Sequence, residues 1–222
     1  IESLCFWAGY VDGFRCDVAS TVPVGFWKAV RQAVEQVRPG AIWLGESVHL
    51  EHIRRFREQG YYAATDTELF DAFDILYPYD LWPLYEGCSE GQLPLSRYFD
   101  AVDRQELSFP TEYNKLRCLE NHDQRRAAAR FPREEMLLAW TALSYFMKGT
   151  TLLYAGQEVC AEHTPSLFEK EPIDWSAGRD ISGYLAQLAA IKKRLPTDEV
   201  FQLETDDAQG LVCSCFHGPA TP

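Results

Sequence analysis

The sequence predicts a parallel α/β fold in which short strands alternate with longer amphipathic helices. Two observations lead to this prediction. The expected strands are almost wholly apolar, as in parallel sheets that helices cover on the outside, and a helical pattern follows most of them. The chain has 222 residues, of which 46% are hydrophobic, and this is enough for one sizeable core.

The first strand is expected at residues 11–17, where an apolar run ends in charge. A turn at residues 21–23 leads into the first helix. Its apolar face recurs at helical spacing and consists of Trp27, Val30, Val34 and Val37. Pro39 and Gly40 end this helix.

The next elements repeat this alternation. Residues 41–45 form the second strand, and a helix over about residues 51–59 follows, with Gly60 as its expected cap. Residues 72–77 form the third strand. A stretch that carries Pro and Gly, residues 83–94, then connects to a helix over residues 96–106.

The last elements are two strands and two helices, after which the pattern changes. They are expected at residues 115–119, 133–146, 149–154 and 182–195. The segment 211–216 reads as a strand with no helix to follow it. A β-rich domain therefore begins near residue 199.

The charge of the chain argues against polyanionic partners. Thirty-three acidic residues against 21 Lys and Arg give a formal net charge of −12. Such a surface repels phosphate backbones and anionic membranes, so we expect no nucleic-acid partner and no membrane association. No apolar run approaches the roughly 20 residues that cross a bilayer.

The seven cysteines show no Cys-x-x-Cys pair and no Cys/His spacing typical of a metal site. Several stand in apolar surroundings, where Cys acts as a small hydrophobic residue. The odd number favours unpaired thiols and a reducing compartment, which is a weak argument for the cytoplasm. We expect no metal among them and no other cofactor.

Polar side chains follow every expected strand, and in parallel α/β folds the chemistry lies at this edge. The candidates are Arg15, Asp17, Glu46, Tyr79, Asp80, Asn121, His122, Asp123, Gln157 and Glu158. Glycosidic bond cleavage needs two carboxyl groups in different protonation states, and a third raises the proton affinity of the acid. Asp17, Glu46 and Asp123 fit these roles.

Two neighbours support the three carboxylates. Arg15 lies on the same strand face as Asp17 and would hold it ionised, and His122 is placed to donate a hydrogen bond to a sugar hydroxyl. Taken singly, an Arg15–Asp17 structural ion pair and a helix cap at Asp123 remain as alternatives.

Five segments together resemble the α-amylase family of glycoside hydrolases (family 13). Residues 12–19 (DGFRCDVA), 43–47 (WLGES) and 119–123 (LENHD) resemble three of its four signature regions. Residues 149–158 are similar to the eighth strand and its loop, and residues 172–175 to a later motif. The resemblance covers residues 11–195.

The resemblance implies a (β/α)8 TIM barrel of which this chain holds strands four to eight. Residues 1–198 would be the C-terminal part of the catalytic barrel, and residues 199–222 the start of a β-rich domain. The signature region at the end of the third strand is expected upstream of Ile1. The partners expected are therefore the missing N-terminal half of the barrel or a second copy of the chain, because the strand at residues 11–17 would be an exposed apolar edge.

The family's roles transfer by motif. Asp17 matches the nucleophile, Glu46 the general acid/base and Asp123 the transition-state carboxylate. Arg15, Asn121 and His122 match substrate-binding and supporting positions. The family retains anomeric configuration, so the carboxyl groups of Asp17 and Glu46 should lie roughly 5–5.5 Å apart.

Two further details concern ligands. Many relatives have Lys-His where this chain has Ser20 and Thr21. In those enzymes the His backbone helps bind calcium, so the sequence does not support a calcium site. Tyr79 and Trp82 are the aromatic residues best placed to stack on sugar rings, and packing of the loops is the alternative.

We therefore expect a retaining α-glycosidase that acts on α-glucans or maltooligosaccharides, with weak or no activity from residues 1–222 alone. The alternative is a non-catalytic α-glucosidase-like domain, such as a transporter-associated ectodomain. Such domains typically lose part of the catalytic triad, which is complete here.

Overall fold

The computed structural model describes residues 1–176, 178–195 and 200–217. It divides into two compact units, one made of Ile1–Tyr85 and Asp100–Leu116 and the other of Glu86–Phe99 and Arg117–Pro222. Within the described residues, no helix has both the length and the apolar character that crossing a membrane requires.

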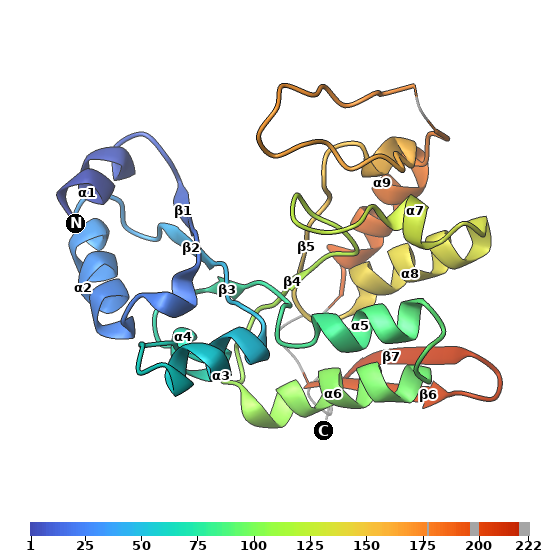
Figure 1. Cartoon of the computed structure of the whole chain (residues 1–222), viewed down its shortest axis with the longest axis horizontal. Coiled ribbons are helices and arrows are strands. Elements are labelled where there is room, and N and C mark those ends of the chain that lie inside the picture. The colour runs from blue at the N-terminus through green and yellow to red at the C-terminus, as the bar shows by residue number, and fades with distance from the viewer. Residues whose placement is uncertain (177, 196–199, 218–222) are drawn as a thin grey trace. The chain divides into compact units, whose positions relative to one another are not determined.

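The first unit is built on a parallel sheet of three strands in chain order (Figure 1). The strands are β1 (Gly13–Cys16), β2 (Ile42–Gly45) and β3 (Ile75–Leu76). Leu44 of β2 pairs with Arg15 on one side and with Ile75 on the other. A parallel bridge from Leu76 to Lys115 continues the order. The prediction of parallel strands is confirmed, although each strand is shorter than the sequence indicated.

Four helices of this unit are α1 (Glu2–Ala8), α2 (Val24–Glu35), α3 (Leu50–Glu58) and the single turn α4 (Asp66–Leu69). Apolar residues of α1, α2 and α4 pack on the sheet in one core, which includes Ala8, Trp27, Val30, Val34, Trp43, Leu69, Phe73 and Leu76. Val37 lies outside this core and is 49% exposed, because α2 ends at Glu35. Helix α1 is absent from the sequence prediction, and Ala8 is its one buried residue.

The stretch at residues 83–94 is not merely a connection, and this part of the prediction is wrong. It contains most of helix α5 (Trp82–Ser89). Pro83 occupies the first turn, where the missing backbone N–H has no intrahelical partner to lose. The chain then turns at Gly91, which has a φ of 73°, and enters α6 (Leu95–Ser108).

Strands β4 (Leu116–Arg117) and β5 (Thr150–Thr151) form a two-stranded sheet, and all of it except Leu116 belongs to the second unit. This unit also contains helices α7 (Ala127–Arg130), α8 (Glu134–Phe146) and α9 (Ser182–Lys192). Helices α8 and α9 pack through an apolar cluster of Tyr145, Ile181, Leu185 and Leu188. Trp140 of α8 is buried between the rings of Phe99 and Phe131. In the first unit, the prediction that Trp27 lies on the apolar, inward face of its helix is confirmed.

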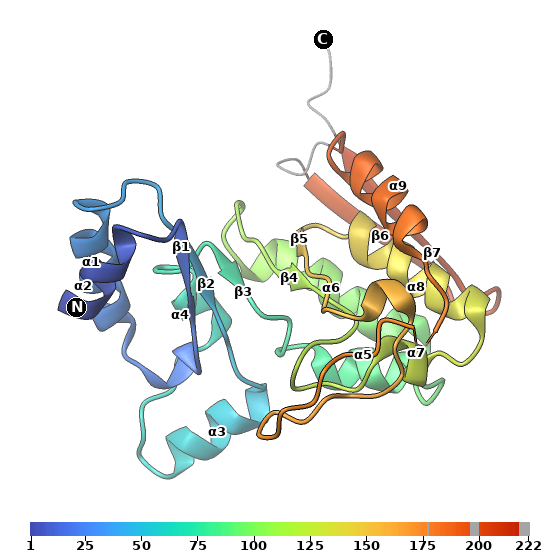
Figure 2. The same ribbon diagram turned by 90° about the horizontal axis from the view of Figure 1, so that it is seen from above.

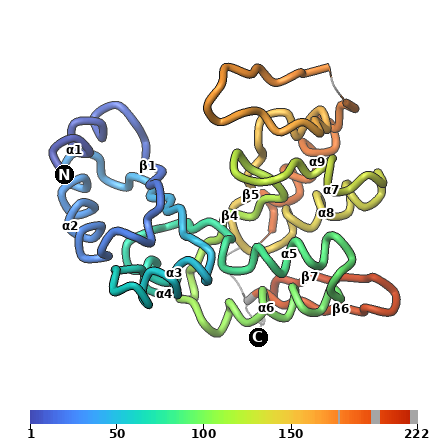
Figure 3. The backbone as a smooth tube through the Cα atoms, viewed as in Figure 1, coloured from blue at the N-terminus to red at the C-terminus, as the bar shows by residue number. Residues whose placement is uncertain are grey.

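The last described residues form an antiparallel hairpin, drawn in red in Figures 2 and 3. It pairs β6 (Val200–Asp206) with β7 (Leu211–His217) along their full length. The strand expected at residues 211–216 is confirmed. The predicted domain boundary between residues 198 and 199 lies outside the described residues.

Leu76 tests how far the first unit depends on its core. Its side chain is fully buried in the shortest strand of the sheet. We expect Leu76→Ala to lower the free energy of unfolding by about 2–5 kcal/mol, since it loses transfer energy and leaves a cavity. Denaturant unfolding measures this. Leu107→Ala is the matched control, because Leu107 is 88% exposed. Equal losses for the two variants would contradict the proposed core.

Candidate active site

Two acidic residues stand at neighbouring strand ends in the first unit. Cys16 and Gly45 are the last paired residues of β1 and β2, and Asp17 and Glu46 follow them directly. The backbone N–H of Glu46 donates to the carbonyl oxygen of Cys16 at 2.9 Å. The sheet register therefore brings both carboxylates to the carboxyl edge, where the sequence predicted them.

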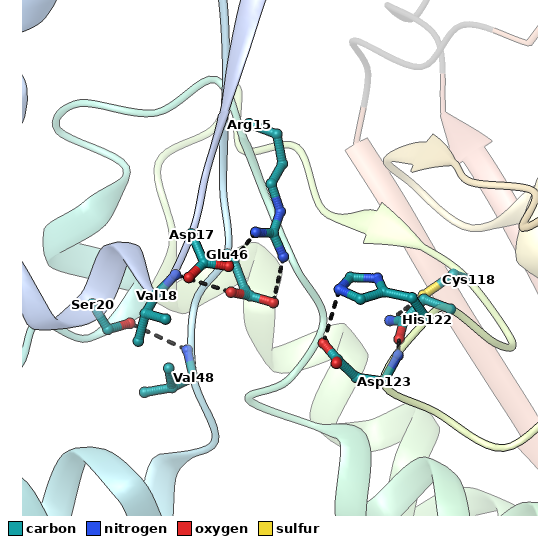
Figure 4. Close-up of polar contacts among 10 residues, drawn as sticks. Arg15, Asp17, Val18, Ser20, Glu46, Val48, Cys118, His122 and Asp123 are labelled. Carbon is teal, nitrogen blue, oxygen red and sulfur yellow. Dashed lines mark hydrogen bonds and ion pairs between the residues drawn. The ribbon is translucent and has the colours of Figure 1, made fainter. Parts of the chain in front are cut away.

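Arg15 joins the two carboxylates (Figure 4). Its Nη1 donates to Asp17 Oδ1, and its Nη2 donates to Glu46 Oε1 at 2.6 Å. The guanidinium carbon also lies 5.5 Å from the centre of the Tyr77 ring. Burial lowers the pKa of Arg15, but hydrogen bonds with Tyr77 and Asp17 and the charge of Glu46 outweigh it, so that the pKa is raised overall. Arg15 is thus a permanent cation between two acids.

The backbone after β1 also holds Glu46. The N–H of Val18 donates to Glu46 Oε2 at 2.9 Å, and the N–H of Ala19 donates to the Glu46 carbonyl oxygen at 2.9 Å. Val18 has φ 43° and ψ 42°, in the left-handed region that β-branched residues rarely adopt. Strained residues of this kind cluster at functional sites. Here the strained turn aims an N–H group at a carboxylate.

The two carboxylates differ in their surroundings. The Glu46 side chain is 9% exposed and that of Asp17 is 76% exposed. Glu46 is therefore fixed by the protein, whereas Asp17 is open to a ligand. Such a contrast suits two acids with different tasks.

Ser20 and Thr21 are engaged within the first unit. The hydroxyl of Ser20 accepts a hydrogen bond from the N–H of Val48 at 3.2 Å, and its carbonyl oxygen accepts one from Ala64 at 2.8 Å. The Thr21 hydroxyl donates to the Val18 carbonyl oxygen at 3.0 Å. Both side chains are therefore engaged by neighbouring residues of the same unit.

A buried lysine lies behind this edge of the sheet. Lys115 is fully buried, and its Nζ donates to Asp66 Oδ2, to Asp80 Oδ1 at 2.8 Å and to the carbonyl oxygen of Tyr77 at 2.9 Å. The Ser47 hydroxyl donates to the same carbonyl at 3.0 Å. Tyr77 is therefore fixed through its backbone, with its ring against Arg15.

Tyr79 and Trp82 are packed inside the first unit. They are 5% and 2% exposed. The ring of Tyr79 stacks flat on His49 at 4.9 Å and meets Trp82 edge-on at 5.8 Å. This burial favours the packing alternative over stacking on sugar for both residues.

The second unit holds the other predicted residues. Asn121 is buried, and its Oδ1 accepts a hydrogen bond from the Asp123 backbone at 2.9 Å. His122 Nε2 lies 3.2 Å from Asp123 Oδ2, and both side chains are more than one third exposed. The turn after β4 therefore pairs the imidazole of His122 with the carboxylate of Asp123, and both groups are partly exposed to solvent (Figure 4).

A buried ion pair supports this turn. Glu120 accepts hydrogen bonds from Arg126 Nη1 at 2.7 Å and from the backbone N–H of Ala127 at 2.5 Å. Burial raises the pKa of Glu120, and the bonds from Ala127 and Arg126 act against this. Glu120 and Arg126 thus clamp both ends of the segment that carries His122 and Asp123.

The sequence prediction missed the role of Val18 and the buried position of Lys115. One signal was available for Lys115, since a lysine at the start of an apolar strand requires buried partners. Nothing in the sequence marks the backbone strain at Val18.

Comparison with known proteins identifies the family. The sequence profile described as the catalytic domain of alpha amylase matches residues 2–210. The chain belongs to the alpha-amylase family. This confirms the resemblance drawn from the signature segments and indicates that the chain is part of a TIM barrel fold.

Individual relatives agree with this membership. The chain is 30% identical to the alpha-amylase MalA of Haloarcula japonica over 71% of its own length and 22% of that protein. It is 26% identical to the intracellular maltogenic amylase of Bacillus subtilis, over 83% of its length and 30% of the relative. The crystal structure of an alpha-amylase from Lactobacillus plantarum superposes with a TM-score of 0.94 at 34% identity, covering 98% of this chain and 52% of that one. The chain thus spans less than one third of the length of the Haloarcula japonica and Bacillus subtilis relatives.

Asp66 makes the buried Lys115 cluster sensitive to pH. Burial raises the pKa of its carboxyl group to about 6, against the pull of Lys115. The folded protein therefore holds this proton more tightly than the unfolded chain, and its stability falls as pH rises from about 4 to 6. We expect the stability of Asp66→Asn relative to the unsubstituted protein to increase over that interval and to level off above it. Denaturant unfolding at each pH measures this, and a constant or decreasing difference would contradict it.

Proposed function

We propose that this chain carries the catalytic carboxylates of a retaining α-glycosidase that acts on α-glucans or maltooligosaccharides. The observation that supports this most is the contact of one guanidinium with Asp17 and Glu46 at adjacent strand ends. A single guanidinium that bonds both carboxyl groups keeps them a few ångströms apart. This agrees with the short separation of retaining enzymes and not with the wider gap that inverting enzymes leave for water.

Each carboxylate takes one role in the proposed reaction. Glu46 protonates the glycosidic oxygen as that oxygen leaves, while Asp17 attacks the anomeric carbon and forms a glycosyl ester. Water then attacks the same carbon, Glu46 takes its proton, and the bond to Asp17 breaks. The exposed position of Asp17 suits attack on a bound sugar, and the hydrogen bond from Arg15 keeps it ionised.

Arg15 also imposes a condition on this scheme. A cation at 2.6 Å from Glu46 favours the ionised form of that side chain, whereas an acid catalyst must begin protonated. We propose that the guanidinium stays on Asp17 and releases Glu46 when a sugar enters. The hydrogen bond from Val18 then remains to orient Glu46.

The second unit supplies the remaining groups of the proposal. Asp123 is the carboxylate that stabilises the positive charge of the transition state, and His122 and Asn121 bind or orient sugar hydroxyls. Their pairing within one turn supports a shared task. The presence of all three carboxylates, Asp17, Glu46 and Asp123, also favours a catalytic role over the non-catalytic alternative.

We also propose that this chain is one part of a larger barrel. Residues 1–222 would hold strands four to eight and would be weakly active or inactive alone, needing the first three strands or association with another copy. We propose no calcium requirement, because Ser20 and Thr21 are engaged by the chain itself. The seven free cysteines and the name of the Bacillus subtilis relative support a reducing, intracellular location.

Replacement of Asp17 tests this function. In a polypeptide that joins this chain to the first three barrel strands, we expect Asp17→Asn to reduce hydrolysis of maltooligosaccharides by about 10⁴-fold or more, since the nucleophile is lost. The rate of release of reducing ends measures this.

Asp71→Asn is the matched control, because Asp71 is exposed and pairs with Lys28 at the surface of the same unit. It should leave the rate unchanged. Full activity in Asp17→Asn would refute the assigned nucleophile, and no activity in the unsubstituted polypeptide would favour the non-catalytic alternative.

A further inference from the structure

The β6–β7 hairpin presents two cysteines to solvent. The seven cysteines are all free, and Cys213 and Cys215 are the exposed ones. Burial raises the pKa of the Cys16 thiol to about 11 and that of Cys118 to about 12, which makes both thiols inert as metal ligands. Cys213 and Cys215 are therefore the two thiols that solvent reaches most freely.

Strand alternation places the two thiols on one face. Exposed and half-buried residues alternate from Leu211 to His217, and Cys213 and Cys215 both belong to the exposed set. At about 3.4 Å per residue, their Cα atoms lie about 6.8 Å apart. Their side chains point the same way, so the Cβ atoms stay too far apart for a disulfide, which needs about 3.8 Å. The pair therefore remains a dithiol.

The register adds a carboxylate to this face. Glu204 of β6 pairs directly with Cys213, and it is also exposed. Directly opposed residues have Cβ atoms about 4.5–5.5 Å apart. Gln202 pairs with Cys215 and is engaged with His217, whose Nε2 lies 2.9 Å from Gln202 Oε1. The face thus offers two sulfur ligands and one oxygen ligand.

We propose that Cys213, Cys215 and Glu204 form a binding site for a thiophilic metal ion of the Zn²⁺ class. Zinc bonds sulfur at about 2.3 Å, so two thiolates in a tetrahedral site lie about 3.8 Å apart. In this structure the ligand atoms of Cys213, Cys215 and Glu204 do not all lie within 4.8 Å of one another, so both thiol side chains must turn toward each other about χ1 to bind one ion. Water fills the fourth position. His217 is not counted as a ligand, because its Nε2 is engaged with Gln202 Oε1 at 2.9 Å.

Binding follows a simple proton balance. Each thiol loses its proton as its sulfur bonds the metal, so one ion releases up to two protons to solvent. No oxidant or reductant takes part. The hairpin is paired along seven residues of each strand, and this paired backbone holds the three ligands on one face before the ion arrives.

Cadmium titration of the reduced 222-residue chain tests the site. We expect one Cd²⁺ per chain, with the ultraviolet charge-transfer band of thiolate–cadmium bonds, and a weaker apparent Cd²⁺ affinity when Zn²⁺ is present in excess. Cys213→Ser and Cys215→Ser should each weaken binding at least tenfold. Glu204→Gln should weaken it less and leave the band, because both sulfurs remain. Circular dichroism verifies that the variants keep the fold.

Cys5→Ser is the matched control, since Cys5 is half-buried in α1, and it should bind as the unsubstituted chain does. Unchanged binding in either hairpin variant would overturn the site. So would half an equivalent of Cd²⁺ per chain, which indicates an ion shared between two molecules.

Discussion

The contact of Arg15 with Asp17 and Glu46 is the interaction on which the candidate site depends. Two unit charges 5 Å apart repel by roughly 3 kcal/mol at an effective dielectric constant of 20, and parallel pairing of β1 with β2 forces these two carboxylates to adjacent strand ends. A cation between them removes this conflict. Because a guanidinium has several donors in one plane, it bonds both acids at once, which a lysine ammonium would do with less directional control.

Other parts of the first unit serve to hold this arrangement. Lys115 and Ser47 fix the backbone of Tyr77, whose ring lies against Arg15, and the strained turn at Val18 supplies the second hydrogen bond to Glu46. The buried charges of Lys115 and Asp66 stabilise little by themselves, because their desolvation offsets their attraction. Their contribution is the fixed position of the strand ends. In the second unit the pair of Glu120 and Arg126 supports the turn with Asp123 in the same manner.

The sequence predicted those features that depend on a simple period. Apolar runs located the strands, and the two-residue spacing of Arg15 and Asp17 placed both on one strand face, as the ion pair shows. The Pro and Gly residues at 83–94 led to the wrong prediction of a simple connection, because the structure has helix α5 over the first half of that stretch. The burial of Tyr79 and Trp82 depends on contacts with distant elements, which no local pattern records. The same holds for Cys213 and Glu204, because a cross-strand pair exists only once the register is known.

We propose that Arg15 prepares Asp17 to attack an anomeric carbon. Covalent trapping tests it most directly. An activated 5-fluoro-α-glucosyl fluoride slows the breakdown of the glycosyl ester, and peptide mass spectrometry then locates the label in a polypeptide that contains this chain and the first three barrel strands. We expect one glucosyl group on the peptide that contains Asp17. This ester should form more slowly in Arg15→Met. A label on Glu46 or Asp123, or turnover with no ester on any of the three, would contradict it.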